Sequence, residues 1–127
     1  MAKITVSVWA GCFDSEDALQ TYTEPVYSDD GDITAPFLTD FGIDQDDFDD
    51  DFFECTKTGM QTDSLAVLLN GCSYGETLIP ALQIVCSDAL PFPCNAAILM
   101  YGYCYDGSVA EKNGIRFIGC APAETDR

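Results

Sequence analysis

The acidic stretch at residues 44–54, DQDDFDDDFFE, places the strictest limit on what this chain can fold into. It holds seven carboxylates in eleven residues and contains no Lys, Arg or His. Because unpaired carboxylates are costly to bury, a folded chain must keep this stretch at its surface. Phe48, Phe52 and Phe53 lie among the acids, although acidic segments that stay solvated are poor in aromatic residues. The rings therefore indicate a stretch that packs or binds.

The negative charge is concentrated in the first half of the chain. The 127 residues carry 22 Asp and Glu against 5 Lys and Arg, a net charge of −17. Residues 1–56 hold 15 of the acids and one base, Lys3, and so contribute −14, while residues 57–127 contribute −3. Such a field repels nucleic acids and anionic membranes, and it speeds association with a basic partner by about 10- to 1000-fold. We therefore expect a basic protein partner, no direct nucleic-acid binding and no membrane contact.

The cysteines do not have the spacing of a metal site. Seven cysteines occur without a CxxC pair, and the chain has no histidine, so the usual zinc patterns are absent. The opening residues, MAKITVSVWA, lack the apolar length of a signal peptide. We expect reduced thiols in a cytoplasmic protein, with no cofactor and no dedicated metal site.

The order of predicted elements indicates an α+β fold. Residues 4–9 alternate as a strand, and Asp14 or Ser15 can cap a short helix. Asp63 or Ser64 can cap another, and a third is predicted with Thr77 as its cap and Pro80 in its first turn. Residues 95–105 and 114–120 are expected to form a hairpin of central strands. We predict a single-domain sandwich over residues 1–127, with helices packed on one face of a mainly antiparallel sheet.

Residues 23–54 are predicted to form an ordered acidic excursion from this domain, with a strand near residues 52–56. The segment is rich in turn residues, yet apolar side chains recur through it in a way that a free linker does not require. We expect these side chains to attach the excursion to the body of the protein: Val26, Tyr27, Phe37, Leu38, Phe41, Ile43 and Phe48.

Enzymatic readings of the chain find little support in its residues. Gly71, Ser73 and Gly75 match the G-x-S-x-G pattern of hydrolases, but a helix is predicted before them and no histidine can accept the serine proton. Cys72 lacks the cationic neighbours that activate a thiol. The acidic run fails the EF-hand register, although adventitious divalent binding stays open. We therefore predict no catalytic residues and no enzymatic activity.

Two interpretations of the acidic run remain, a solvated loop and a face that binds a partner. The interleaved rings favour the second, because aromatic anchors and steering charges together make a binding surface. Trp9 and Tyr74 are secondary candidates. Trp9 is equally suited to the core, because alternate residues of a strand face opposite sides and either side of this strand can be the buried one. The predicted partner-binding residues are Asp44, Asp46, Asp47, Phe48, Asp49, Asp50, Asp51, Phe52, Phe53, Glu54, Trp9 and Tyr74.

Short motifs occur in a definite order along the chain. The first is VSVWAGCF at residues 6–13. The later ones are Pro36 and Phe37, the run Asp40, Phe41, Gly42 and Ile43, then Asp51, Phe52 and Glu54, then Cys72, Ser73 and Tyr74, and finally Asn95 before Leu99, Met100 and Tyr101. In their order and spacing these motifs resemble the immunity protein 22 family of bacterial polymorphic-toxin and contact-dependent growth inhibition systems. The resemblance implies a small cytoplasmic α+β protein that is not an enzyme and neutralises a cognate toxin by binding it.

The charge and the resemblance together predict an immunity protein whose acidic, aromatic-studded surface binds a toxin domain with a basic surface, such as a nuclease. The alternative is an acidic nucleic-acid mimic, or a regulator, that binds a basic host protein. The sequence sets neither the toxin's chemistry nor the oligomeric state.

Overall fold

The middle of the sheet is β1 (Ala2–Gly11), the strand that the alternation at residues 4–9 predicts. The computed structural model describes residues 2–48, 52–70, 72, 75–86 and 88–125. Five antiparallel strands follow the order β4-β5-β1-β7-β6, and a separate two-stranded ribbon joins β2 to β3. The other strands are β2 (Val26–Tyr27), β3 (Ile33–Thr34), β4 (Phe53–Ser64), β5 (Ala89–Tyr101), β6 (Glu111–Lys112) and β7 (Ile115–Thr125).

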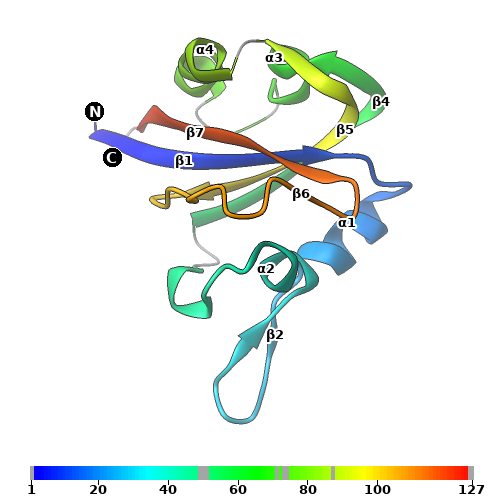
Figure 1. Ribbon diagram of the computed structural model, residues 1–127, viewed down its shortest axis with the longest axis vertical. Coiled ribbons are helices and arrows are strands. Elements are labelled where there is room, and N and C mark those ends of the chain that lie inside the picture. Colours follow the sequence, from blue (N-terminus) through cyan, green and yellow to red (C-terminus); the bar gives the residue numbers. More distant parts are fainter. Residues whose placement is uncertain (1, 49–51, 71, 73–74, 87, 126–127) are drawn as a thin grey trace.

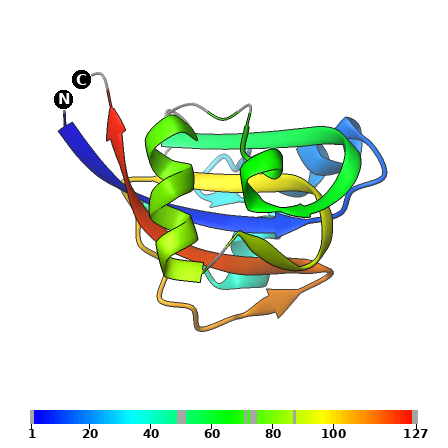
Figure 2. The ribbon, with the colours of Figure 1, turned by 90° about the horizontal axis from the view of Figure 1, so that it is seen from above.

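Helices cover both faces of this sheet (Figure 1). On one face lie α3 (Leu65–Leu68) and α4 (Gly75–Cys86), and Figure 2 shows both lying over the strands. On the other lie α1 (Glu16–Thr23) and α2 (Pro36–Phe41), with the 3₁₀ turn η1 (Gln45–Asp47). The predicted α+β class, with helices on an antiparallel sheet, is confirmed. The prediction placed the helices on one face of the sheet, but the acidic excursion folds into α2 and η1, which lie on the other face.

The central strand is consequently buried on both sides. Val6 and Val8 point into a leucine-rich cluster beneath α3 and α4, and Trp9 points into an aromatic cluster beneath α2. All three side chains are fully buried. The aromatic cluster draws Phe37, Phe41 and the other excursion residues Leu38, Ile43 and Phe48 against the sheet, which confirms that these side chains attach the excursion.

Several local predictions are confirmed. The Ser15 side chain caps α1 by accepting a hydrogen bond from Ala18 N at 3.1 Å, and Ser64 caps α3 by accepting one from Val67 N at 3.4 Å. The strand predicted near residues 52–56 is the start of β4. Asn113 and Gly114, both with positive φ, form the tight turn between β6 and β7.

The predicted hairpin of β5 and β7 is wrong, because β1 lies between them and pairs with each. The pattern of apolar residues marks both as buried strands, but pairing order depends on contacts far apart in the sequence. β7 makes its own hairpin with the short strand β6 instead.

The predicted start of α4 is also wrong. The helix begins at Gly75, so Thr77 and Pro80 lie inside it. Thr77 serves another purpose: its Oγ1 accepts a hydrogen bond from Glu124 N at 2.8 Å and ties α4 to β7. Burial of Leu78 and Leu82 against the sheet stabilises a helix that an interior proline weakens.

Asn95 fixes the turn that leaves β1, which gives a first testable prediction. Its Oδ1 accepts a hydrogen bond from Phe13 N at 2.9 Å, and its Nδ2 donates one to Phe13 O at 2.8 Å. Because Asn95→Ala leaves both backbone groups of a half-buried residue without this partner, we expect the free energy of unfolding to fall by about 1–3 kcal/mol in urea denaturation. The exposed Asn70 gives the control, Asn70→Ala. Equal midpoints for the two variants would contradict this role.

Candidate functional site

The acidic stretch begins as a short exposed turn held by its own side chains. Asp44, Asp46 and Asp47 are exposed around η1, and Asp44 caps that turn by accepting a hydrogen bond from Asp46 N at 3.0 Å. Phe48 follows directly and is 7% exposed. Its ring lies 5.3 Å from the ring of Phe53 in β4, so the aromatic cluster holds the turn while its carboxylates face solvent.

A second group of acids lies beside this turn. Gln45 Oε1 accepts a hydrogen bond from Ile33 N in β3, and Gln45 Nε2 donates one to Asp32 Oδ1 at 3.2 Å. These bonds join η1 to the β2–β3 ribbon, whose connecting turn carries further exposed acids. We call the combined set the acidic surface: Asp29, Asp30, Asp32, Asp44, Asp46 and Asp47.

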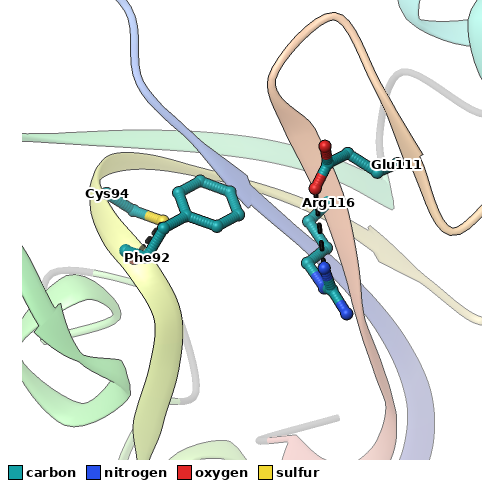
Figure 3. A network of polar contacts seen from close by, with 4 residues as sticks. All are labelled: Phe92, Cys94, Glu111 and Arg116. Atoms are coloured by element: carbon teal, nitrogen blue, oxygen red, sulfur yellow. Dashed lines mark hydrogen bonds and ion pairs between the residues drawn. The ribbon is translucent and has the colours of Figure 1, made fainter.

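No basic side chain lies near these carboxylates in the sequence, because there is no Lys, Arg or His from residue 4 to residue 56. Arg116 lies on β7, opposite Glu111 of β6, and its guanidinium is 3.5 Å from that carboxylate (Figure 3). Both side chains are about half exposed, and such pairs contribute only about 0–1 kcal/mol to stability. The acidic surface thus keeps its negative field.

Two apolar side chains stand out on the ribbon next to these acids. Val26 is 60% exposed and Tyr27 is 57% exposed. Both side chains were expected from the sequence to attach the excursion to the body of the protein, and this prediction is wrong for them. Among the described residues, the two-residue strand β2 pairs with β3 in a ribbon separate from the main sheet, which explains the exposure of both side chains. Val26 and Tyr27 form an apolar run of two residues between turn residues, and this shortness was the sequence signal that could have distinguished them from the buried Phe37 and Phe41.

Trp9 and Phe48 are structural residues in this fold, which corrects their inclusion among the partner-binding residues. Trp9 has no exposed surface, and its ring centroid lies 4.8 Å from that of Phe37, 5.4 Å from Tyr105 and 5.3 Å from Phe117. The sequence left open whether the Trp9 side chain points to the core or to the surface, and in the structure it points to the core. Phe48 is buried because the aromatic cluster provides its partner.

The start of β4 sends neighbouring side chains to opposite faces of the sheet. Phe53 is half-buried against Phe37 and Phe48, and Phe52 is 38% exposed. Glu54 points the other way and accepts a hydrogen bond from the Tyr101 hydroxyl. Glu54 therefore does not face the same way as Phe53, so the predicted run is not one continuous surface.

Cys72 lies in the connection between α3 and α4, near Glu54. Burial first, and then the charge of Glu54, raise the pKa of this thiol to about 12. The thiol is therefore protonated at neutral pH, which counts against a nucleophilic role. Within the G-x-S-x-G match, Gly71 and Ser73 lie outside the described residues, but a helix does precede the match, as predicted.

Four predicted partner-binding residues lie outside the part of the chain that the structure describes: Asp49, Asp50, Asp51 and Tyr74. Among the described residues, no three His, Cys, Asp or Glu side chains come together as a metal-ion site. Likewise, none of the helices described has the length and hydropathy of a membrane span.

A comparison with models of protein families shows which family this chain belongs to. The family model for Immunity protein 22 matches residues 6–122. This chain belongs to the Immunity protein 22 family. Comparisons with curated proteins and with solved structures gave no match. Family membership implies toxin neutralisation, and members of immunity protein families are typically non-enzymatic inhibitors.

Several residues that carry the family resemblance build the fold of this immunity protein and do not lie on the acidic surface. Trp9 and Phe37 form the aromatic cluster, and Gly42 ends α2 with a φ of 63°. Asp40 Oδ2 accepts hydrogen bonds from the Tyr22 hydroxyl at 2.9 Å and from Asn113 Nδ2 at 2.7 Å. These residues therefore position the excursion on the sheet.

Proposed function

We propose that this immunity protein neutralises its toxin by placing the acidic surface against a basic surface of the toxin. The observation that carries the proposal is a set of exposed carboxylates on η1 and the ribbon, with no basic side chain in that part of the sequence. Family membership supplies the class of partner. A nuclease is the proposed toxin, because nuclease sites are cationic in order to hold phosphates and carboxylates compete for the same groups.

The way the acidic surface is held supports binding without a large ordering cost. Phe48 is anchored in the aromatic cluster, and Gln45 connects the turn to Ile33 and Asp32. A surface that is ordered before binding loses less conformational freedom when the complex forms. Val26 and Tyr27 add apolar area beside the charges, so the surface offers both steering and anchoring.

Co-expression with the toxin encoded beside this protein tests the proposed function. We expect cells that hold the immunity protein to survive, and the toxin domain to be recovered bound to it in a pull-down. Killing of cells that contain abundant folded immunity protein would contradict the proposal. The alternative, an acidic mimic that binds a basic host protein, predicts such killing because it involves no toxin.

Charge removal on η1 should slow the association of the two proteins. We expect Asp46→Asn with Asp47→Asn to lower the association rate constant by about threefold to tenfold at low salt, because rim charges act mainly on the encounter. Asp44 is left unchanged, since its side chain caps the turn. Stopped-flow mixing with the toxin domain measures the rate.

The matched control removes the same amount of charge elsewhere, through Asp63→Asn with Glu76→Gln. Both side chains are exposed, at the end of β4 and in the first turn of α4. A rate constant lowered equally in the two double variants would assign the effect to net charge and contradict a role for the acidic surface.

A further inference from the structure

A buried serine holds two cysteines together at the edge of the aromatic cluster. Ser7 lies in β1 opposite Cys120 of β7 and has no exposed surface. Its Oγ donates a hydrogen bond to Tyr103 O at 2.6 Å and accepts one from Tyr105 N at 2.9 Å. The serine therefore fixes the backbone on both sides of Cys104, directly over its own cross-strand neighbour.

The two sulfur atoms are in contact as a result. Cys104 Sγ lies 2.8 Å from Cys120 Sγ, and Cys120 Sγ lies 3.3 Å from Ser7 Oγ. The chain turns into this position at Gly102, whose φ is 76° and whose N–H donates to Thr5 O. Cys104 is exposed and Cys120 is half-buried. A small reagent can therefore reach Cys104 Sγ, and Cys120 Sγ is in place to react with it next.

The other cysteines lack this arrangement. Cys94 is buried and its sulfur contacts Phe92 O, and the sulfur of the half-buried Cys55 contacts Thr23 Oγ1. Cys12 is exposed, but its sulfur contacts Pro93 O and Gln61 Nε2 instead of a second sulfur. Cys104 and Cys120 are therefore set apart by a direct contact between their sulfur atoms, one of which belongs to an exposed residue.

We propose that Cys104 and Cys120 are an oxidation site, a dithiol that small-molecule disulfides convert to an intramolecular disulfide. The Cys104 thiolate attacks one sulfur of the small disulfide, which forms a mixed disulfide and releases one thiol. Cys120 then attacks Cys104 Sγ and releases the second thiol. The protein dithiol loses two protons and two electrons, and the small disulfide gains them and is reduced to two thiols.

The new bond would tie the loop at residues 102–110 to β7. That loop carries Tyr105, whose hydroxyl donates to Phe41 O in α2 at 2.6 Å, so the bond also reinforces the layer that holds the acidic surface. Closing a loop of about 15 residues restricts the unfolded chain, and we expect the Tm to rise by about 10 °C. The inference is independent of the toxin.

Oxidised glutathione acting on the intact, purified protein tests the site. We expect the mass to fall by about 2 Da through the loss of two hydrogens, and peptide mapping to join Cys104 to Cys120. A hydrogen bond with Cys120 raises the pKa of Cys104, so the reaction should slow as the pH falls. Dithiothreitol should restore both the mass and the original Tm.

Two variants make the test decisive. Cys104→Ser changes an exposed side chain and should abolish the loss of mass and the shift in Tm, whereas Cys12→Ser should keep both. Stable glutathione adducts on Cys104 or Cys120 without a crosslink would overturn the proposal. So would a crosslink that joins other cysteines of the native, folded protein.

Discussion

The Trp9→Ala variant is expected to lose about 3–5 kcal/mol of its free energy of unfolding, the largest effect of any single substitution proposed for this chain. Trp9 is fully buried and lies within 6.0 Å of the rings of Phe37, Phe41, Tyr105 and Phe117, measured between centroids. Removing it leaves a cavity between β1 and α2. Urea denaturation followed by circular dichroism measures the loss.

Trp9→Phe separates ring packing from hydrogen bonding. The Trp9 Nε1 atom has no hydrogen-bond partner among the described residues, so phenylalanine gives up ring area without breaking a hydrogen bond. We therefore expect a clearly smaller loss than for alanine. If both variants kept the unfolding free energy of the parent, Trp9 would not belong to the core, and the surface role that the sequence also allowed would return.

The Tyr27→Ala variant is expected to weaken toxin binding by about 30-fold, equivalent to about 2 kcal/mol. The ring is 57% exposed on β2, beside the acids of the ribbon, and has area to bury against a partner. Large aromatic side chains with a polar tip are the residues that most often dominate an interface. Titration calorimetry with the toxin domain measures the affinity, and thermal unfolding shows whether the fold is kept.

Ile84→Ala provides the matched control for this variant. Ile84 is the most exposed large apolar side chain of α4, at 87%, and α4 covers the face of the sheet opposite the ribbon. We expect the affinity of this variant to equal that of the parent protein. An unchanged affinity for Tyr27→Ala, or an equal loss for both variants, would move the interface away from the acidic surface.

The sequence predicted local structure well because the responsible interactions are local. Ser15 and Ser64 cap their helices through atoms within three residues, and the Asn113 turn needs only a positive φ. Strand order is different, because β1 separates β5 from β7 through pairings about a hundred residues apart. Nothing in the alternation of a strand specifies which strand lies beside it.

The candidate site was predicted in part for a similar reason. The exposure of Asp44, Asp46 and Asp47 follows from the cost of burying carboxylates. The role of an aromatic side chain among acids is not predictable in this way. It can pack against the protein's own core or bind a partner, and the sequence pattern is the same in both cases. Phe48 took the first role, while Tyr27 was left at the surface.

Phe48 and Phe53 explain how a folded chain keeps the start of so acidic a run in place. Their rings, 5.3 Å apart, pack on the sheet at the two ends of the segment that contains the central acids. Full burial of a phenylalanine side chain contributes about 1.5–3 kcal/mol, which Phe48 nearly reaches and the half-buried Phe53 reaches in part, and this offsets the repulsion among exposed carboxylates. The same packing fixes where the charge is displayed.

The salt dependence of the association rate tests the central claim most directly. The rate constant for this immunity protein and the toxin encoded beside it would be measured from about 20 mM to about 500 mM salt, a range over which screening shortens the reach of surface charges several-fold. Binding through the acidic surface predicts a steep fall, by tenfold or more. A rate constant that stays the same across this range would contradict it.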